Sequence, residues 1–93
     1  MRYRIEYTDE ARLALRTLPG RYRQRVRKII EALIDNPRPS HASGLRDLPD
    51  CFRIRLNGWR IVYRVKDESL VVVILRVRQK TGTETYSGLT DPN

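Results

Sequence analysis

Six arginines alternate with other residues in the second half of the chain, at spacings that would place them on one face of a β-sheet. They are Arg53, Arg55, Arg60, Arg64, Arg76 and Arg78. Guanidinium groups bind phosphodiesters through paired hydrogen bonds, and they stabilise the charge that builds up when a phosphodiester is broken. No Asp or Glu occurs among residues 51–66 or 70–79 to offset that charge. The pattern favours a phosphate polymer as the ligand of this face over a merely solvated surface.

The same residues could support cleavage of RNA as well as binding. RNA carries its own nucleophile, the 2′-hydroxyl, so cleavage needs a proton acceptor, cations around the phosphorane and a donor to the leaving oxygen. The single histidine, His41, lies in a Pro- and Ser-rich loop predicted over residues 36–44. Tyr86 could accept the proton instead, because nearby cations lower a phenol's pKa. Lys80 could donate a proton or neutralise charge.

Asn57-Gly58 predicts a tight hairpin, because a two-residue type I′ turn needs positive φ at both positions. Strands over residues 52–56 and 59–65 then place Arg55 directly opposite Arg60. Like charges across a ladder destabilise a sheet by a few tenths of a kcal/mol to about 1 kcal/mol. A pair that costs stability indicates a functional role.

The face opposite the arginines is predicted to be apolar or aromatic throughout if a three-residue turn, residues 67–69, joins the second and third strands. It would carry Phe52, Ile54, Leu56, Trp59, Ile61, Tyr63, Val65, Val71, Val73, Leu75 and Val77. Such a face must be covered. Two helices upstream can cover it: a short one that Thr8-Asp9 caps and Pro19-Gly20 ends, and a second over about residues 21–35. Residues 2–7 alternate as a half-buried strand.

Composition restricts the partners and the compartment. The 93 residues predict one domain, 1–93, in which residues 88–93 form a flexible tail. Nineteen Lys and Arg against eleven Asp and Glu give a net charge of +8, which favours a polyanionic partner. Cys51 is the only cysteine and favours a reducing cytoplasm. No metal-ligand spacing, cofactor-binding loop or membrane-spanning apolar run is present in the sequence, so we expect no metal, no cofactor and no membrane partner.

The segment "LRDLPDCFRIRLNGWRIVYRVKDESLVVVILRVRQKTGTETYS", residues 45–87, resembles the RelE branch of the RelE/ParE toxin superfamily. The resemblance implies an α+β fold, with a small, twisted, mainly antiparallel sheet of about four strands and two N-terminal helices packed on one face. It implies cleavage of mRNA in the ribosomal A site by 2′-hydroxyl attack. It also implies a cognate antitoxin, encoded nearby and carrying an acidic or amphipathic segment.

Residue roles follow from the same resemblance. Arg53 and Arg55 match paired basic residues on the first hairpin strand, and Arg60 matches a phosphate-stabilising arginine. Tyr86 matches a tyrosine proposed as general base. Lys80 stands where well-known members have an arginine near the leaving group, a role that Arg78 could also fill. Arg64, Arg76 and Arg78 are expected to bind RNA.

Two other functions remain open from the sequence. A ParE-like inhibitor of DNA gyrase could use the same fold without phosphodiester chemistry, since gyrase-inhibiting relatives share strands similar to "WRIVYRV". A nucleic-acid-binding module without toxicity could use the arginines only to contact phosphates. Arrested translation, DNA damage signalling or the absence of toxicity would distinguish the three.

Overall fold

A five-stranded sheet and two helices make up the described part of the chain. The computed structural model describes residues 1–79, in the order β1 (Arg4–Tyr7), α1 (Asp9–Thr17), α2 (Gly20–Ala32), β2 (Ser43–Leu45), β3 (Leu48–Leu56), β4 (Trp59–Lys66) and β5 (Val71–Gln79). The strand order is β1-β5-β4-β3-β2. Only β1 pairs in parallel, with β5, and the other described pairings are antiparallel. The predicted α+β fold is confirmed, with five strands in place of about four, because β2 forms where the sequence predicted only a loop.

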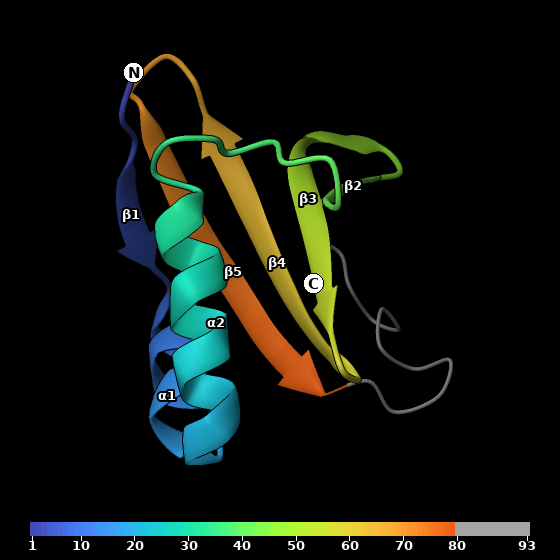
Figure 1. Ribbon diagram of the computed structural model, residues 1–93. Coiled ribbons are helices and arrows are strands. Elements are labelled where there is room, and N and C mark those ends of the chain that lie inside the picture. Colours follow the sequence, from blue (N-terminus) through green and yellow to red (C-terminus); the bar gives the residue numbers. More distant parts are fainter. Residues whose placement is uncertain (80–93) are drawn as a thin grey trace.

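Both helices lie on one face of the sheet, as Figure 1 shows. Thr8 caps α1, because its hydroxyl oxygen accepts a hydrogen bond from the Ala11 amide at 3.0 Å. Pro19 precedes α2 and separates it from α1. The predicted helices are therefore present, although α2 ends at Ala32, three residues before the predicted end.

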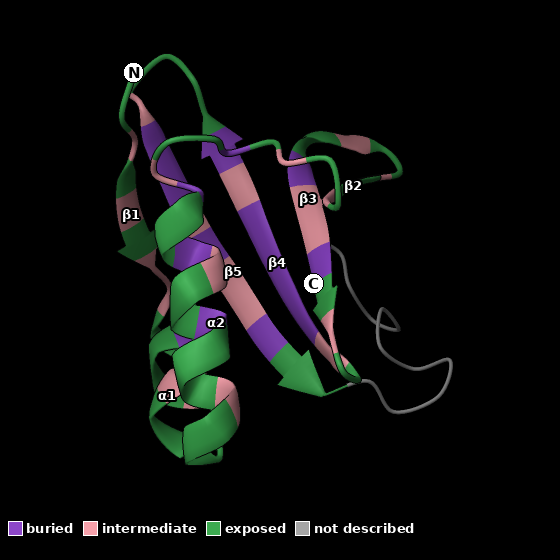
Figure 2. Cartoon of the chain, in the orientation of Figure 1, coloured by how far each residue is buried: buried purple, intermediate pink, exposed green. Residues whose placement is uncertain are grey.

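The core forms between the helices and the covered face of the sheet. Its fully or almost fully buried members are Ala11, Leu18, Val26, Ile30, Leu33, Ile54, Ile61, Tyr63, Val65, Val72, Ile74 and Val77. Figure 2 shows this burial running along β4 and β5, while the outer sides of α1 and α2 are exposed. Phe52 and Trp59, predicted to be in the core, are only half-buried and pack at its edge.

The β3–β4 hairpin has the predicted register. Asn57 and Gly58 have φ values of 45° and 84°, so both adopt the left-handed conformation that a type I′ turn requires. Leu56 pairs with Trp59 and Arg55 pairs with Arg60. The turn thus fixes which side chains of β3 and β4 share a face.

The predicted turn between β4 and β5 is wrong by one residue. Four residues, 67–70, form the connection, and Leu70 has a φ of 54°, a conformation that a leucine rarely adopts. The extra residue reverses which side chains of early β5 face the helices. Val72 and Ile74 are therefore in the core, whereas Val73 and Leu75, predicted to be there, are half-buried outside it.

A β-bulge at Leu75 then restores the predicted facing of the last residues of β5. Tyr63 pairs with Ile74 and Val62 pairs with Arg76, so Leu75 is the additional residue. The Thr8 hydroxyl donates a hydrogen bond to the Leu75 carbonyl oxygen at 2.8 Å. The bulge thereby anchors the start of α1 against β5, and Val77 faces the core as predicted.

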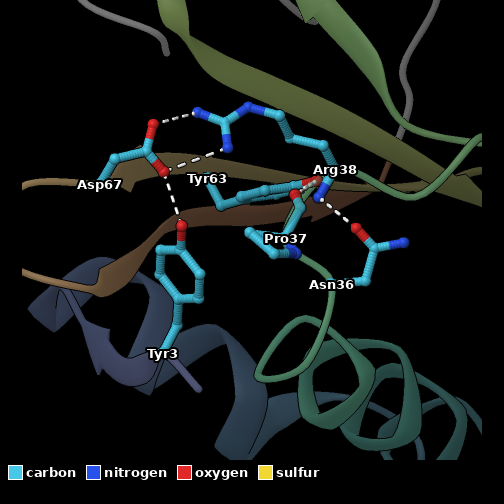
Figure 3. A network of polar contacts seen from close by, with 6 residues as sticks. All are labelled: Tyr3, Asn36, Pro37, Arg38, Tyr63 and Asp67. Carbon is cyan, nitrogen blue, oxygen red and sulfur yellow. Dashed lines mark hydrogen bonds and ion pairs between the residues drawn. The ribbon is translucent and has the colours of Figure 1, made fainter. Parts of the chain in front are cut away.

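A polar corner joins the N-terminus, the loop after α2 and the β4–β5 turn (Figure 3). Arg38 donates two hydrogen bonds to the Asp67 carboxylate, at 3.1 and 2.7 Å, and the Tyr3 hydroxyl donates a third at 2.7 Å. These hydrogen bonds, Arg38 first, lower the pKa of Asp67 below its ordinary value. Tyr63 donates to the Pro37 carbonyl oxygen at 2.8 Å, and burial raises its pKa to about 12. The corner fixes the loop against β4.

Within residues 1–79, no helix combines the length and the apolarity that crossing a bilayer would require.

Candidate nucleic-acid interface and active site

Three arginines form a row across three adjacent strands. Arg60, on the central strand β4, pairs with Arg55 of β3 on one side and with Arg78 of β5 on the other. Arg60 is only 6% exposed, whereas Arg55 and Arg78 are open to solvent. Three guanidinium groups at one level of a sheet repel one another, which makes the row a place where added negative charge is favourable.

A second row and a third continue the same surface. Val62 of β4 pairs with Arg53 and Arg76, and Arg64 pairs with Cys51 and Val73. All six arginines predicted from the sequence therefore share the face of β3–β5 that is opposite the helices. We call this surface the arginine face, and define it as Arg53, Arg55, Arg60, Arg64, Arg76 and Arg78.

Glu10 is a residue beside the arginine face that the sequence did not reveal. Its Oε2 atom lies 2.8 Å from Nε of Arg76 and 3.2 Å from Nε of Arg78. The side chain of Arg76 is 20% exposed and that of Arg78 is 52% exposed, so both remain accessible beside the carboxylate. Glu10 thus holds two neighbouring guanidinium groups in place and offsets part of their charge.

The position of Glu10 depends on the pairing of β1 with β5. That pairing puts the first turn of α1 beside β5, and the Thr8 amide donates to the Ile74 carbonyl oxygen at 3.1 Å. Glu10 in the first turn of a helix looks like an ordinary helix-dipole residue in the sequence. The only signal in the sequence was the position of Glu10, two residues after the helix cap that follows a strand. That position does not indicate which other strand lies beside the helix.

Two of the predicted catalytic residues, Lys80 and Tyr86, lie outside residues 1–79 and so outside the described structure, as does the predicted tail at 88–93. The described chain ends with Gln79, which pairs with Trp59 at the hairpin end of β4. Residue 78 is in the first arginine row. Arg53, Arg55 and Arg60 are thus brought together by the sheet, and the two remaining predicted residues follow further along the chain.

The arginine face can bind a phosphodiester and stabilise added negative charge on it. The buried position of Arg60 between two other arginines suits a group whose charge rises during a reaction, because partly desolvated donors interact more strongly than exposed ones. Within the described residues no group of three or more His, Cys, Asp or Glu side chains could hold a metal ion. The groups that the described part of this surface offers to a ligand are mainly guanidinium groups.

Comparison with known proteins shows which family has this fold. The family described as "ParE toxin of type II toxin-antitoxin system, parDE" matches residues 3–81. The mRNA interferase toxin RelE of Escherichia coli K12 is 34% identical over 89 residues, which cover 94% of this chain and 93% of that protein.

Solved structures show the same fold. The isolated E. coli RelE toxin superimposes with a TM-score of 0.79 at 32% identity, covering 91% of this chain and 92% of that one. The toxin of the intact E. coli RelBE toxin–antitoxin complex gives a TM-score of 0.76 at 32% identity, covering 85% and 96%. The chain belongs to the RelE/ParE toxin family of type II toxin–antitoxin systems, and it is a RelE-like member.

Proposed function

We propose that this protein is a ribosome-dependent endoribonuclease that cleaves mRNA and so inhibits translation. The observation that carries the proposal is the row of Arg55, Arg60 and Arg78 across β3, β4 and β5, with Arg60 almost buried. A relative that is 34% identical is named an mRNA interferase, which supports the same activity. The row would place three cations side by side next to a phosphate that lies on this face.

In the proposed reaction the 2′-hydroxyl of the RNA attacks the adjacent phosphorus, the bond to the 5′-oxygen breaks, and a cyclic phosphate forms. Tyr86 accepts the 2′-hydroxyl proton, and Arg60, assisted by Arg55 and Arg53, stabilises the charge of the phosphorane. Lys80 lies near the leaving oxygen, where it donates a proton or neutralises charge. Because RNA supplies the nucleophile, we propose a reaction that needs no metal.

The outer arginines would hold the RNA on either side of the reacting phosphate. Arg76 lies in the second row and Arg64 in the third, and Arg78 is shared between binding and the first row. Contacts of this kind position a backbone without reading its sequence. Recognition of the codon would therefore depend on the ribosome and on residues other than the arginine face.

A cognate antitoxin would be the second partner. The E. coli relative has been solved in complex with its antitoxin, which supports an antitoxin for this chain. We propose that an acidic or amphipathic segment of it covers the arginine face or displaces the segment that contains Tyr86. Both partners are expected in the cytoplasm. Because only the folded toxin offers the site, antitoxin binding should raise the toxin's melting temperature.

The decisive experiment is cleavage of mRNA on programmed ribosomes by the purified protein. We expect fragments that end in a cyclic phosphate. Tyr86→Phe keeps the ring but removes the ionisable hydroxyl, so it should reduce the cleavage rate while leaving the melting temperature unchanged. Wild-type cleavage by Tyr86→Phe would exclude the phenol as the base, and absence of cleavage by the native protein would exclude the enzyme.

Lys80→Arg distinguishes the two roles proposed for Lys80. A guanidinium group keeps the charge but gives up a proton far less readily than an ammonium group. If Lys80 only neutralises charge, the cleavage rate should stay near that of the wild type. A large loss would assign the proton transfer to Lys80.

A ParE-like inhibitor of DNA gyrase is the second candidate, because the matching family description names the ParE toxin. The two candidates differ in their target, so one pair of assays separates them. Inhibition of gyrase supercoiling by the purified protein, without mRNA cleavage on ribosomes, would favour the second candidate.

A further inference from the structure

The helices carry a second basic surface, on the side of the sheet away from the arginine face. A cavity of about 440 Å³ lies between α1, α2 and the end of β1. Its apolar lining comes from Tyr7, Leu15 and Ile30, and its cationic lining comes from Arg12, Arg16 and Arg27, together with Arg23. We call it the helix pocket. A volume of this size accommodates one or two large side chains or a small ligand.

The cations of the helix pocket come from both helices. Arg12 and Arg16 are one helical turn apart on α1, and Arg27 is one turn after Arg23 on α2. Like charges at i,i+4 spacing destabilise a helix by roughly 0.2–0.5 kcal/mol per pair. Two such pairs meet at one cavity, and of these cations Arg12 also lies 3.8 Å from the Asp9 carboxylate in an exposed ion pair.

Arg23 keeps the pocket in shape. Its Nη2 donates hydrogen bonds to the carbonyl oxygens of Arg16, at 3.2 Å, and Leu18, at 2.9 Å. These bonds tie α2 to the C-terminal end of α1, where Leu18 is buried in the core. The guanidinium group of Arg23 is therefore used to connect the helices. Arg16 and Arg27, together with Arg12 beside Asp9, are the other cations that line the pocket.

The base of the pocket is both apolar and close to the charges. Burial, the largest effect, and the nearby Glu31 carboxylate raise the pKa of the Tyr7 phenol, while Arg27 and Arg12 lower it. The two arginines are thus within electrostatic reach of the half-buried ring of Tyr7. A ligand that fills the pocket must present apolar surface to Leu15 and Tyr7, and negative charge to the arginines around them.

We propose that the helix pocket anchors an acidic segment of the antitoxin, in which a large apolar side chain is flanked by Asp or Glu residues. This inference rests on the proposed toxin–antitoxin function and names a docking point separate from the arginine face. The apolar side chain would occupy the space beside Leu15 and Ile30, and the carboxylates would pair with Arg12, Arg16 and Arg27. An RNA backbone matches the charges but offers nothing to the apolar base, so a peptide fits the pocket better.

The test measures the affinity of the purified antitoxin for charge-reversal variants. The antitoxin is the neighbouring reading frame's product, chosen because it relieves the toxicity of this chain. Arg16→Glu and Arg27→Glu should each weaken binding at least about tenfold, because each leaves a carboxylate of the partner facing a negative charge. Arg25→Glu is the matched control, since Arg25 is exposed on α2 and does not line the pocket. It should change affinity less than about threefold.

Two further measurements make the outcomes unambiguous. Melting curves verify that each variant is folded. If Arg16→Glu or Arg27→Glu does not fold, the neutral variant Arg16→Gln or Arg27→Gln is measured in its place. Cleavage on programmed ribosomes should be unchanged in the pocket variants.

Three outcomes would contradict the proposal in different ways. If the wild type binds the antitoxin tightly, and Arg16→Glu and Arg27→Glu weaken binding no more than Arg25→Glu does, the proposal for the helix pocket alone is wrong. Loss of ribosome binding with intact antitoxin binding would make it an RNA contact, which also overturns the proposal. If no neighbouring product binds the wild type, the toxin–antitoxin function itself fails.

Discussion

The two faces of β3–β5 carry opposite kinds of side chain on the same strands. Ile61 and Tyr63 of β4 are fully buried beneath the helices, whereas Arg60 and Arg64, the residues that alternate with them, belong to the arginine face. Burial of apolar surface stabilises one face, and repulsion among guanidinium groups destabilises the other. The pleat therefore places the main core residues and the arginines on opposite faces of the same strands. Substitutions on the two faces should have separate effects on stability and on activity.

The covered face should show the largest effect on stability. Ile74 is fully buried, and Ile74→Ala should lower the free energy of unfolding by roughly 2–5 kcal/mol. Leu75, at the bulge, is half-buried outside the core, so Leu75→Ala should cost much less. Urea denaturation of both variants measures the difference. A greater loss for Leu75→Ala than for Ile74→Ala would show that the three-residue turn is correct and that the bulge is absent.

This pair of variants addresses the part of the fold that the sequence could not specify. "LVVVIL", residues 70–75, is apolar at every position, so it has no period-two signal that fixes which residues face the core. Nothing in Leu70 indicates that it adopts positive φ. By contrast, "CFRIRLNGWRIVYR" alternates clearly and includes Asn-Gly, and its register was predicted correctly.

The positions of the candidate site residues could be predicted wherever polar and apolar residues alternate along a strand. The arginines of β3 and β4 follow from the hairpin. Arg76 and Arg78 were also placed on the correct face, because the longer turn and the bulge at Leu75 shift the chain by one residue each and cancel. Glu10 could not be found in this way, since its place depends on β1 pairing with β5. Long-range pairings of that kind leave no local pattern.

Arg60→Ala should produce the largest effect on activity. Loss of one preorganised donor commonly lowers a rate by roughly 10²–10³-fold, so single-turnover cleavage should fall by that factor while ribosome affinity changes far less. Arg21→Ala is the control, because Arg21 is exposed on α2 and stacks 5.0 Å from the Tyr22 ring centroid. It should weaken binding slightly and leave the chemical step unchanged. Wild-type cleavage by both Arg60→Ala and Tyr86→Phe would remove the nuclease assignment and favour gyrase as the target.

Glu10→Gln should have a smaller effect, in the opposite direction. The carboxylate pairs with Arg76 and Arg78, so a phosphate that binds there must compete with it. Its neutralisation should strengthen ribosome binding a few-fold at low salt and make that binding more sensitive to salt. Asp35→Asn removes the carboxylate from a different exposed ion pair, with Arg2 at 3.3 Å, and serves as the control. Weaker binding by Glu10→Gln, together with a lower melting temperature, would assign Glu10 to ordering the arginines alone.

Asp67→Asn should have the smallest effect, and one that depends on pH. Arg38 and Tyr3 depress the pKa of Asp67 in the folded protein below its ordinary value of 3.8. Its contribution to stability is therefore complete above that value and is lost as the pH falls through the lower, folded-state pKa. The variant should unfold at a lower urea concentration than the wild type near pH 7, and the two midpoints should converge in strongly acidic solution. The difference should be modest, because the pair is exposed to solvent.

Glu68→Gln, a change at an exposed neighbour in the same turn, is the control and should shift the urea midpoint little at any pH. A constant gap between Asp67→Asn and the wild type at every pH would mean that the introduced amide disturbs the packing of the corner, and that the charge of Asp67 is not what stabilises it.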